Sequence, residues 1–307
     1  FPSEYKITDA GRATKGAAKI LLGKVYLTKG DFAKSKEKLA EVVEQEGAYG
    51  YGLQTNYGDN WNLDTEVGKE AVLYIEYKPD PFPHNDEMSL TGPKYSIPEP
   101  VGVTGSNEAD IPTMELNDAF KENDKRKAVN LRTHYTNPTN GKELISSIPL
   151  FGKYWQEGIT AIKFCEINMH IIRYSDALLM YAEALNEWKH GPTTEAYAAI
   201  NEVRRRGYGY PSNTGSCDLS NLNEETFREA VRKERAYELA FEGHRRMDLV
   251  RWGIYYETIQ KTNAALANWW DSADNYRYLL YKYTEKNKHE LLPIPQREKD
   301  LCIQFKQ

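Results

Sequence analysis

Cysteine, histidine and long apolar runs are all scarce in this sequence of 307 residues. Its three cysteines do not make a disulfide framework, and no two of them have Cys-x-x-Cys spacing. No stretch approaches the about 18 apolar residues that a transmembrane helix needs. The six histidines include no His-x-x-x-His pair, which argues against a zinc protease. We therefore expect no metal site and no cofactor.

The signatures of nucleotide binding and of covalent catalysis are also missing or incomplete. The segment 11–16 has the glycine spacing of a P-loop, but Ala17 and Ala18 stand where Lys and Ser or Thr are required. No Gly-x-Ser-x-Gly nucleophile elbow occurs. The net charge of -5 provides no basic field for nucleic acid. The sequence predicts no catalytic residue of these classes and no nucleic-acid partner.

The segment 60–66, with the sequence NWNLDTE, alternates oxygen-bearing side chains as the start of a calcium loop does. However, the sixth position of such a loop is Thr65 rather than Gly, and the twelfth is Ala71 rather than Glu. A polar loop is the favoured interpretation, and a structural calcium ion stays open.

What the sequence does contain is enough apolar material for a sizeable core, at 40% hydrophobic residues against 28% charged ones. Its 22 Tyr and 6 Trp outnumber its 9 Phe. Rings with a polar group suit surfaces where a ring stacks and also forms hydrogen bonds, and sugars present such a surface. The alternative is that the tyrosines fill half-buried helix positions.

Two helical hairpins are predicted, over Thr14–Gln45 and Ile171–Arg206. In the first, Leu21 and Val25 recur at helical spacing, and Gly30-Asp31 ends one helix and caps the next. Both hairpins partly match the tetratricopeptide pattern. The matching positions are Leu22, Gly23, Tyr26, Ser35 and Leu39 in the first hairpin, and Ala182, Ala196 and Ile200 in the second.

The region between the hairpins, residues 47–162, is rich in Gly, Pro, Asn and aromatic residues, and we expect it to be largely irregular. One strand is predicted over residues 71–77, followed by a long loop. Residues 163–307 add further helices, with a break at Gly243-His244, and a C-terminal tail. The predicted organisation is a hairpin over 1–46, a loop-rich region that forms the ligand face, and a helical remainder.

The charge-dense segment Arg232–Asp248 carries Glu234, Glu238 and Glu242 on one helical stripe. Paired carboxylates would suit a glycoside hydrolase. Arginines are interleaved at 232, 235, 245 and 246, however, and their pairing would keep the carboxylate pKa values low, whereas a general acid needs a raised pKa. We therefore expect a structural ion-pair network in which these side chains pair with one another or cap neighbouring helices.

Four segments together resemble the SusD/RagB family of starch-utilisation-system D-like proteins. They are GRATKGAAKILLGKVYLTKGD near the start, IIRYSDALLMYAEALNE, RKERAYELAFEGHRRMDLVRWG and HELLPIPQREKDL near the end. They occur in the family's order and span the whole chain, so the match is specific although each segment alone is weak.

The resemblance implies a mostly α fold of tetratricopeptide-like hairpins with a long loop-rich insertion. Members of the family are lipid-anchored proteins of the outer membrane surface that bind glycans or other nutrients and pass them to a TonB-dependent transporter barrel. They are not enzymes. The chain looks like the C-terminal part of a member, and it opens without Met or a signal-peptide pattern. We expect that the lipid-carrying cysteine and the family's N-terminal helical part lie outside it.

The family has no binding motif to transfer, so ligand-binding candidates come from chemistry. An exposed aromatic ring is needed for stacking, and a nearby amide or carboxylate for selectivity. The candidate platforms are Tyr95, Trp61, Trp155, Trp269 and Trp270, and the candidate polar partners are Asp86, Asp271 and Asn275. The alternative for each tryptophan is a buried packing role.

Two other functions stay open. One is a tetratricopeptide scaffold that grips a peptide in a groove, and the other is a glycoside hydrolase. The scaffold needs contiguous repeats, whereas the predicted hairpins begin 157 residues apart, at Thr14 and Ile171. This separation argues against the scaffold.

Overall fold

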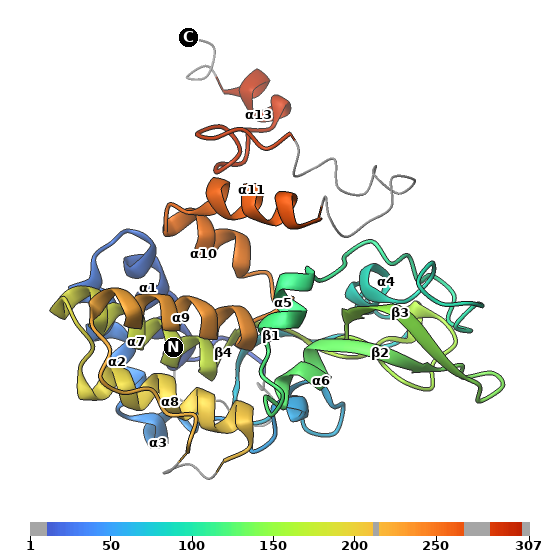
Figure 1. Ribbon diagram of the computed structural model, residues 1–307, viewed down its shortest axis with the longest axis horizontal. Coiled ribbons are helices and arrows are strands. Elements are labelled where there is room, and N and C mark those ends of the chain that lie inside the picture. The colour runs from blue at the N-terminus through green and yellow to red at the C-terminus, as the bar shows by residue number, and fades with distance from the viewer. Residues whose placement is uncertain (1–10, 211–214, 267–282, 303–307) are drawn as a thin grey trace. The chain divides into compact units, whose positions relative to one another are not determined.

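The computed structural model describes residues 11–210, 215–266 and 283–302. The chain divides into two compact units, Phe1–Gly243 and His244–Gln307, and each is described by itself. Long helices lie side by side in the first unit (Figure 1). They are α1 (Lys15–Thr28), α2 (Phe32–Val43), α7 (Tyr174–Lys189), α8 (Thr194–Tyr208) and α9 (Glu224–Glu238). Both predicted hairpins, α1–α2 and α7–α8, are confirmed.

Side-chain caps explain where these helices begin. Thr14 accepts a hydrogen bond from the backbone N–H of Ala17 at 3.1 Å, and Asp31 caps α2 as the sequence predicts. Thr193 caps α8 in the same way, and Asn223 forms a capping box at the start of α9. Each cap satisfies N–H groups that have no partner within the helix, so the local sequence fixes these boundaries.

Small residues let the helices of each hairpin approach closely. A Cβ atom added to Gly23 would come within 2.7 Å of the Leu39 side chain, so only glycine allows this contact of α1 with α2. The Ser35 hydroxyl donates to the Gly23 carbonyl oxygen at 2.9 Å across the same contact. In the second hairpin Ala182 and Ala196 are fully buried. These are positions that the tetratricopeptide match assigned to small residues.

Only some of the apolar residues that mark α1 as a helix are buried. Leu21, Leu22 and Val25 are 48%, 39% and 47% exposed, whereas Ile20 and Leu27 are buried. Apolar residues surround this helix on several sides, so their spacing could not tell which side packs inward. The close approach at the glycine in its middle sets the rotation of the helix.

The two hairpins are neighbours in space, which corrects the argument from their separation in sequence. Helix α2 packs against α7, and α7 in turn packs against α8 and α9 (Figure 1). The intervening region leaves this array after α2 and returns directly before α7. An insertion therefore interrupts the chain without interrupting the helical stack.

The insertion is largely irregular, as predicted, and holds short elements. They are α3 (Glu46–Tyr49), η2 (Tyr57–Trp61), β1 (Ala71–Ile75), α4 (Glu87–Thr91), α5 (Met114–Ala119), α6 (Arg126–Asn130), β2 (Leu131–Thr136), β3 (Glu143–Phe151) and η3 (Ile162–Phe164). The predicted strand is β1, which pairs antiparallel with β4 (Met169–Arg173) immediately before α7. Strands β2 and β3 form an antiparallel hairpin that was not predicted.

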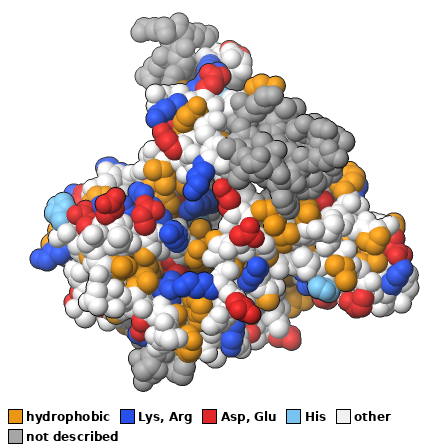
Figure 2. Space-filling model, viewed as in Figure 1, with side chains coloured by type: hydrophobic (Ala, Val, Ile, Leu, Met, Phe, Trp, Pro, Cys, Tyr) orange, Lys and Arg blue, Asp and Glu red, His pale blue; other side chains and the backbone are white. Residues whose placement is uncertain are grey.

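The second unit holds the short helices α10 (Arg245–Arg251), α11 (Tyr255–Leu266) and α13 (Gln296–Leu301). Gly243, with φ of +76°, provides the left-handed backbone at the predicted break before α10. Among the described helices of the chain, none combines the length and the apolar character that crossing a bilayer requires. On the face drawn in Figure 2, basic and acidic side chains are intermixed.

Candidate functional site

Tyr95 lies in the loop that follows α4, and its residue surface is 60% exposed. The carboxylate of Glu108 anchors this loop through hydrogen bonds. One of its oxygens accepts hydrogen bonds from the backbone N–H groups of Lys94, Tyr95 and Ser96, at 2.7, 2.7 and 2.9 Å. Three successive N–H groups that converge on one carboxylate oxygen fix the backbone conformation on both sides of the ring.

Further hydrogen bonds tie the Tyr95 loop to regular structure. The backbone N–H of Ser147, in β3, donates to the Ser96 carbonyl oxygen at 2.8 Å, and the hydroxyl groups of Ser146 and Ser96 are 2.7 Å apart. On the other side Asn107 donates to the Ser89 hydroxyl of α4 at 2.6 Å. The ring is thus presented by a loop held between a strand and a helix, so little conformational freedom remains to be lost when a ligand stacks on it.

Asp86 lies at the N-terminal end of α4, and Tyr95 follows its C-terminal end. The Asp86 side chain is 79% exposed, and its carboxylate is 3.0 Å from the ring of His84. Glu87 stands next to it, where burial first, and then the charges of Asp110 and Asp86, raise the pKa of the Glu87 carboxyl group. The structure therefore places an exposed ring and hydrogen-bonding carboxyl groups around one short helix.

Two of the candidate platforms lie in the interior. Trp61 is 7% exposed and packs edge-on against Tyr57, with the ammonium of Lys153 4.4 Å from its ring centroid. Trp155 is 6% exposed and packs edge-on against Tyr135. Both rings have the packing role that the sequence left as the alternative, because neither offers an open face for stacking. We do not retain them as platforms.

The remaining candidates, Trp269, Trp270, Asp271 and Asn275, lie outside the described residues. Their role as a second stacking platform with polar partners stays a prediction. Tyr95 and Asp86 are the candidates that the described part of the chain presents at its surface.

The three glutamates of the charge-dense segment are buried and paired, as its structural interpretation required, whereas Lys233 and Arg245 are exposed. Glu234, Glu238 and Glu242 are 0%, 0% and 5% exposed. Two arginines of the same segment pair with other carboxylates. Arg235 pairs with Asp176, and Arg232 pairs with Glu229.

The carboxylates of Glu234 and Glu238 in α9, and of Glu242 after its end, meet cations from distant segments, and together they form the buried charge network. Its cations are Arg126, Lys153, Arg173, Arg204 and Arg206, and its anions are Glu70, Asp124, Glu234, Glu238 and Glu242. Opposite charges balance within this set, which is the condition for burying it.

Glu238 lies at the centre of the network. Its side chain contacts Arg126 at 3.2 Å and Arg173 at 3.0 Å, and it also pairs with Arg206. Burial by itself would raise the pKa of Glu238, but the three guanidinium groups outweigh burial and hold that pKa below its usual value. In Glu70 burial again raises the pKa, but Arg206 and Arg173 together lower it further, to about 2. Both groups are ionised, so neither is suited to act as a general acid.

Sequence reasoning missed Glu108 and the distant partners of the network. One signal was available for Arg173, which stands in the otherwise apolar stretch MHIIRY just before α7. A charged residue at a position that the pattern predicts to be buried indicates a buried ion pair. Glu108 carries no such signal, because the N–H groups that it binds belong to residues 12 to 14 positions earlier in the chain.

The calcium-like segment is anchored in the interior at its two ends, whereas residues 62–65 are exposed. Asn60 is buried and donates to the Tyr57 carbonyl oxygen at 3.0 Å, while Glu66 is buried and accepts from the backbone N–H of Asn168 at 2.9 Å. Among the residues that the structure describes, no three His, Cys, Asp or Glu side chains are grouped so as to hold a metal ion.

The stability of the protein should fall as the pH rises through 7 because of Glu66. Burial raises the pKa of this carboxyl group from 4.5 to about 7. A group whose pKa is higher in the folded state stabilises the fold fully below its unfolded value, and this contribution is lost as the pH rises through the folded value. Glu66→Gln keeps an acceptor for Asn168 and removes the charge, so we expect it to stabilise the protein by about 1–3 kcal/mol at about pH 8.

Urea unfolding at about pH 5 and about pH 8 measures this difference. The two proteins should be nearly equal at the lower pH. Glu37→Gln is the matched control, because the Glu37 side chain is 61% exposed and its charge does not contribute to the raised pKa of Glu66, so any small effect should be the same at both pH values. A Glu66→Gln variant with the pH profile of the wild type would contradict the prediction.

With this geometry in view, we compared the chain with known proteins. The SusD family profile matches residues 147–307. SusD-like protein P25 of Formosa agariphila is 27% identical over 333 aligned positions, which cover 96% of this chain and 58% of that protein.

Solved structures are similar over nearly the whole chain. A SusD homologue from Bacteroides thetaiotaomicron is 33% identical with a TM-score of 0.79, and the match covers 98% of this chain and 65% of that one. A laminarin-binding SusD-like protein is 25% identical with a TM-score of 0.63, and the match covers 97% of this chain and 63% of that one. The chain thus spans more than half, but less than two thirds, of the length of these relatives.

Proposed function

This chain belongs to the SusD family, and we propose that it captures a glycan at the cell surface for delivery to a TonB-dependent outer-membrane transporter. The observation that carries the proposal is the exposed ring of Tyr95 on a loop that Glu108 fixes. A sugar ring stacks on such a platform, and carboxyl groups like that of Asp86 accept hydrogen bonds from its hydroxyl groups. The laminarin-binding relative supports a glucan as the first ligand to test.

The alternative of a glycoside hydrolase has no support in the carboxylates of the charge-dense segment. Glu234, Glu238 and Glu242 are buried and bonded to arginine or lysine side chains, so a substrate could not reach them without unfolding of the network. Binding without hydrolysis is therefore the function that the described residues support best.

A glycan array probed with the full-length protein tests the proposal, with laminarin oligosaccharides included. We expect binding of one glycan class and no release of sugar on prolonged incubation. An immobilised complex of the protein with its neighbouring transporter then tests delivery, because the bound glycan should pass to the transporter. Absence of binding to every glycan would refute the proposal, and sugar release would favour the hydrolase.

Affinity for a neutral oligosaccharide should hardly depend on salt. Stacking and hydrogen bonds to uncharged hydroxyl groups are not weakened by Debye screening, which acts on charges. We expect less than about a twofold change in Kd between roughly 0.05 and 0.5 M NaCl, measured by isothermal titration calorimetry. A steep loss of affinity with salt would instead indicate a charged ligand.

A further inference from the structure

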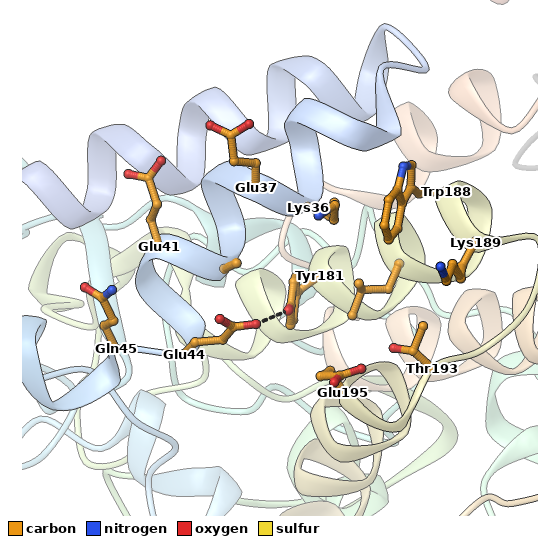
Figure 3. A pocket seen from close by; sticks show the side chains of 12 residues that line it. Lys36, Glu37, Glu41, Glu44, Gln45, Tyr181, Trp188, Lys189, Thr193 and Glu195 are labelled. Carbon is orange, nitrogen blue, oxygen red and sulfur yellow. Dashed lines mark hydrogen bonds between the residues drawn. The ribbon is translucent and has the colours of Figure 1, made fainter.

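A groove of about 460 Å³ lies on the helical array where α2, α7 and the start of α8 meet (Figure 3). Its floor is apolar and aromatic, made by Ala40, Tyr181, Leu185 and Trp188. Trp188 is 41% exposed. None of the residues that line the groove belongs to the Tyr95 loop or to α4, so this is a second surface, separate from the proposed glycan site.

The charges around the groove are distributed unevenly. At one end Lys36 and Lys189 flank Trp188, with their ammonium nitrogens 4.2 and 5.1 Å from its ring centroid. Towards the other end Figure 3 shows the carboxylates of Glu41, in α2, and of Glu44, directly after it. Glu37 and Glu195 also line the groove, so its lysines lie beside Trp188 whereas its carboxylates are distributed along it.

Internal bonds give the groove a defined shape. The Tyr181 hydroxyl donates to the Glu44 carboxylate at 2.5 Å across the gap between α7 and α2. Glu41 is held by Lys19 and Lys38, at 2.6 and 2.5 Å. Because the walls of the groove are helices that already pack together, no segment has to become ordered when a ligand binds.

This charge distribution fits a peptide better than a neutral sugar. A neutral glycan would remove water from the lysine and glutamate side chains without offering them an opposite charge, which is unfavourable. A peptide segment carries groups of both signs and apolar side chains at fixed spacing. The spatial contact of α2 with α7 also removes the separation in sequence that argued against a peptide-binding helical scaffold.

We propose that this groove binds a peptide segment of a partner protein. An apolar side chain of the segment packs on Trp188 and Leu185. An acidic group lies towards Lys36 and Lys189, and a basic group lies towards Glu44.

The test uses the full chain and a phage-displayed library of random peptides about 12 residues long, with the Trp188→Ala variant for counter-selection. We expect the enriched peptides to share an acidic, an apolar and a basic position in one order. A synthetic copy of the best peptide should bind Trp188→Ala and the charge reversal Glu44→Lys about tenfold or more weakly than the wild type. Its affinity should fall as salt rises.

Tyr95→Ala is the matched control, because it removes an exposed ring outside the groove and should leave peptide affinity unchanged. Melting temperatures of both alanine variants show that the protein remains folded. Failure to enrich any peptide over the Trp188→Ala background would overturn the proposal. So would enriched peptides whose affinity is the same for the wild type and both groove variants.

Discussion

Glu238→Gln is expected to lower the free energy of unfolding by about 3–5 kcal/mol, because it removes one charge from a buried ion-pair network and leaves the other charges in place. The Glu238 carboxylate pairs with Arg126, Arg173 and Arg206 while all of these side chains are nearly or fully buried. Glutamine has nearly the same volume, so the loss reports the charge rather than a cavity. Urea unfolding followed by circular dichroism measures it.

Glu229→Gln is the matched control for this measurement. It lies on the same helix, its side chain is 52% exposed, and its partner in an ion pair is Arg232. Exposed pairs of this kind contribute about 0–1 kcal/mol. Equal urea midpoints for Glu238→Gln and the wild type, together with lost glycan binding, would move Glu238 from the structural network to the binding site.

Tyr95→Ala should weaken glycan binding about tenfold or more and leave the melting temperature nearly unmoved. The ring is 60% exposed, so the folded protein loses little packing when it is removed, whereas a stacked sugar loses apolar contact worth about 25 cal/mol per Å². Tyr95→Phe should retain most of the affinity, because the stacking face is kept. Calorimetric titration with the oligosaccharide found on the array gives the Kd of each variant.

Glu108→Ala should also weaken binding although it leaves the Tyr95 ring present. Without the carboxylate, the N–H groups of residues 94–96 lose their common acceptor. Ordering the loop when the glycan binds then costs conformational entropy, which lowers the affinity. Trp188→Ala serves as the control for an exposed ring elsewhere and should bind the glycan as the wild type does. Full affinity in Tyr95→Ala would exclude this ring as a platform and would shift the search to the predicted Trp269 and Trp270.

Local features of the sequence predicted the helical hairpins correctly because local chemistry controls them. Asp31 caps the helix that follows it, and Gly23 lets α1 approach α2 closely. The apolar period predicts a helix whichever neighbour that helix packs against. The four segments that resemble the SusD/RagB family likewise led to the correct family, and the family profile and solved structures confirm it.

The sequence did not predict the β2–β3 hairpin. Alternation along β3 is present in its burial pattern, yet the sequence does not show it, because Ser146 is on the buried face and Ile145 on the exposed face. The sequence also did not identify the buried face of α1, since Leu21 and Leu22 are as apolar as Ile20, which packs inward. Which face of such a helix is buried depends on its neighbour, and periodicity alone does not identify the neighbour.

The sequence by itself determined the family and the hairpins, because each motif and each helical period is read from residues close together in the chain. It also predicted a structural role for Glu234, Glu238 and Glu242, although their partners in the network come from distant segments. Only the tertiary structure decided which cations pair with Glu238, which rings are exposed, and that α2 and α7 together line a groove. These properties depend on contacts between segments that lie tens to more than a hundred residues apart. Pairing and exposure are set when such segments meet, since a carboxylate bonds to whichever cation the fold brings within reach and a ring is exposed only where no other segment covers it.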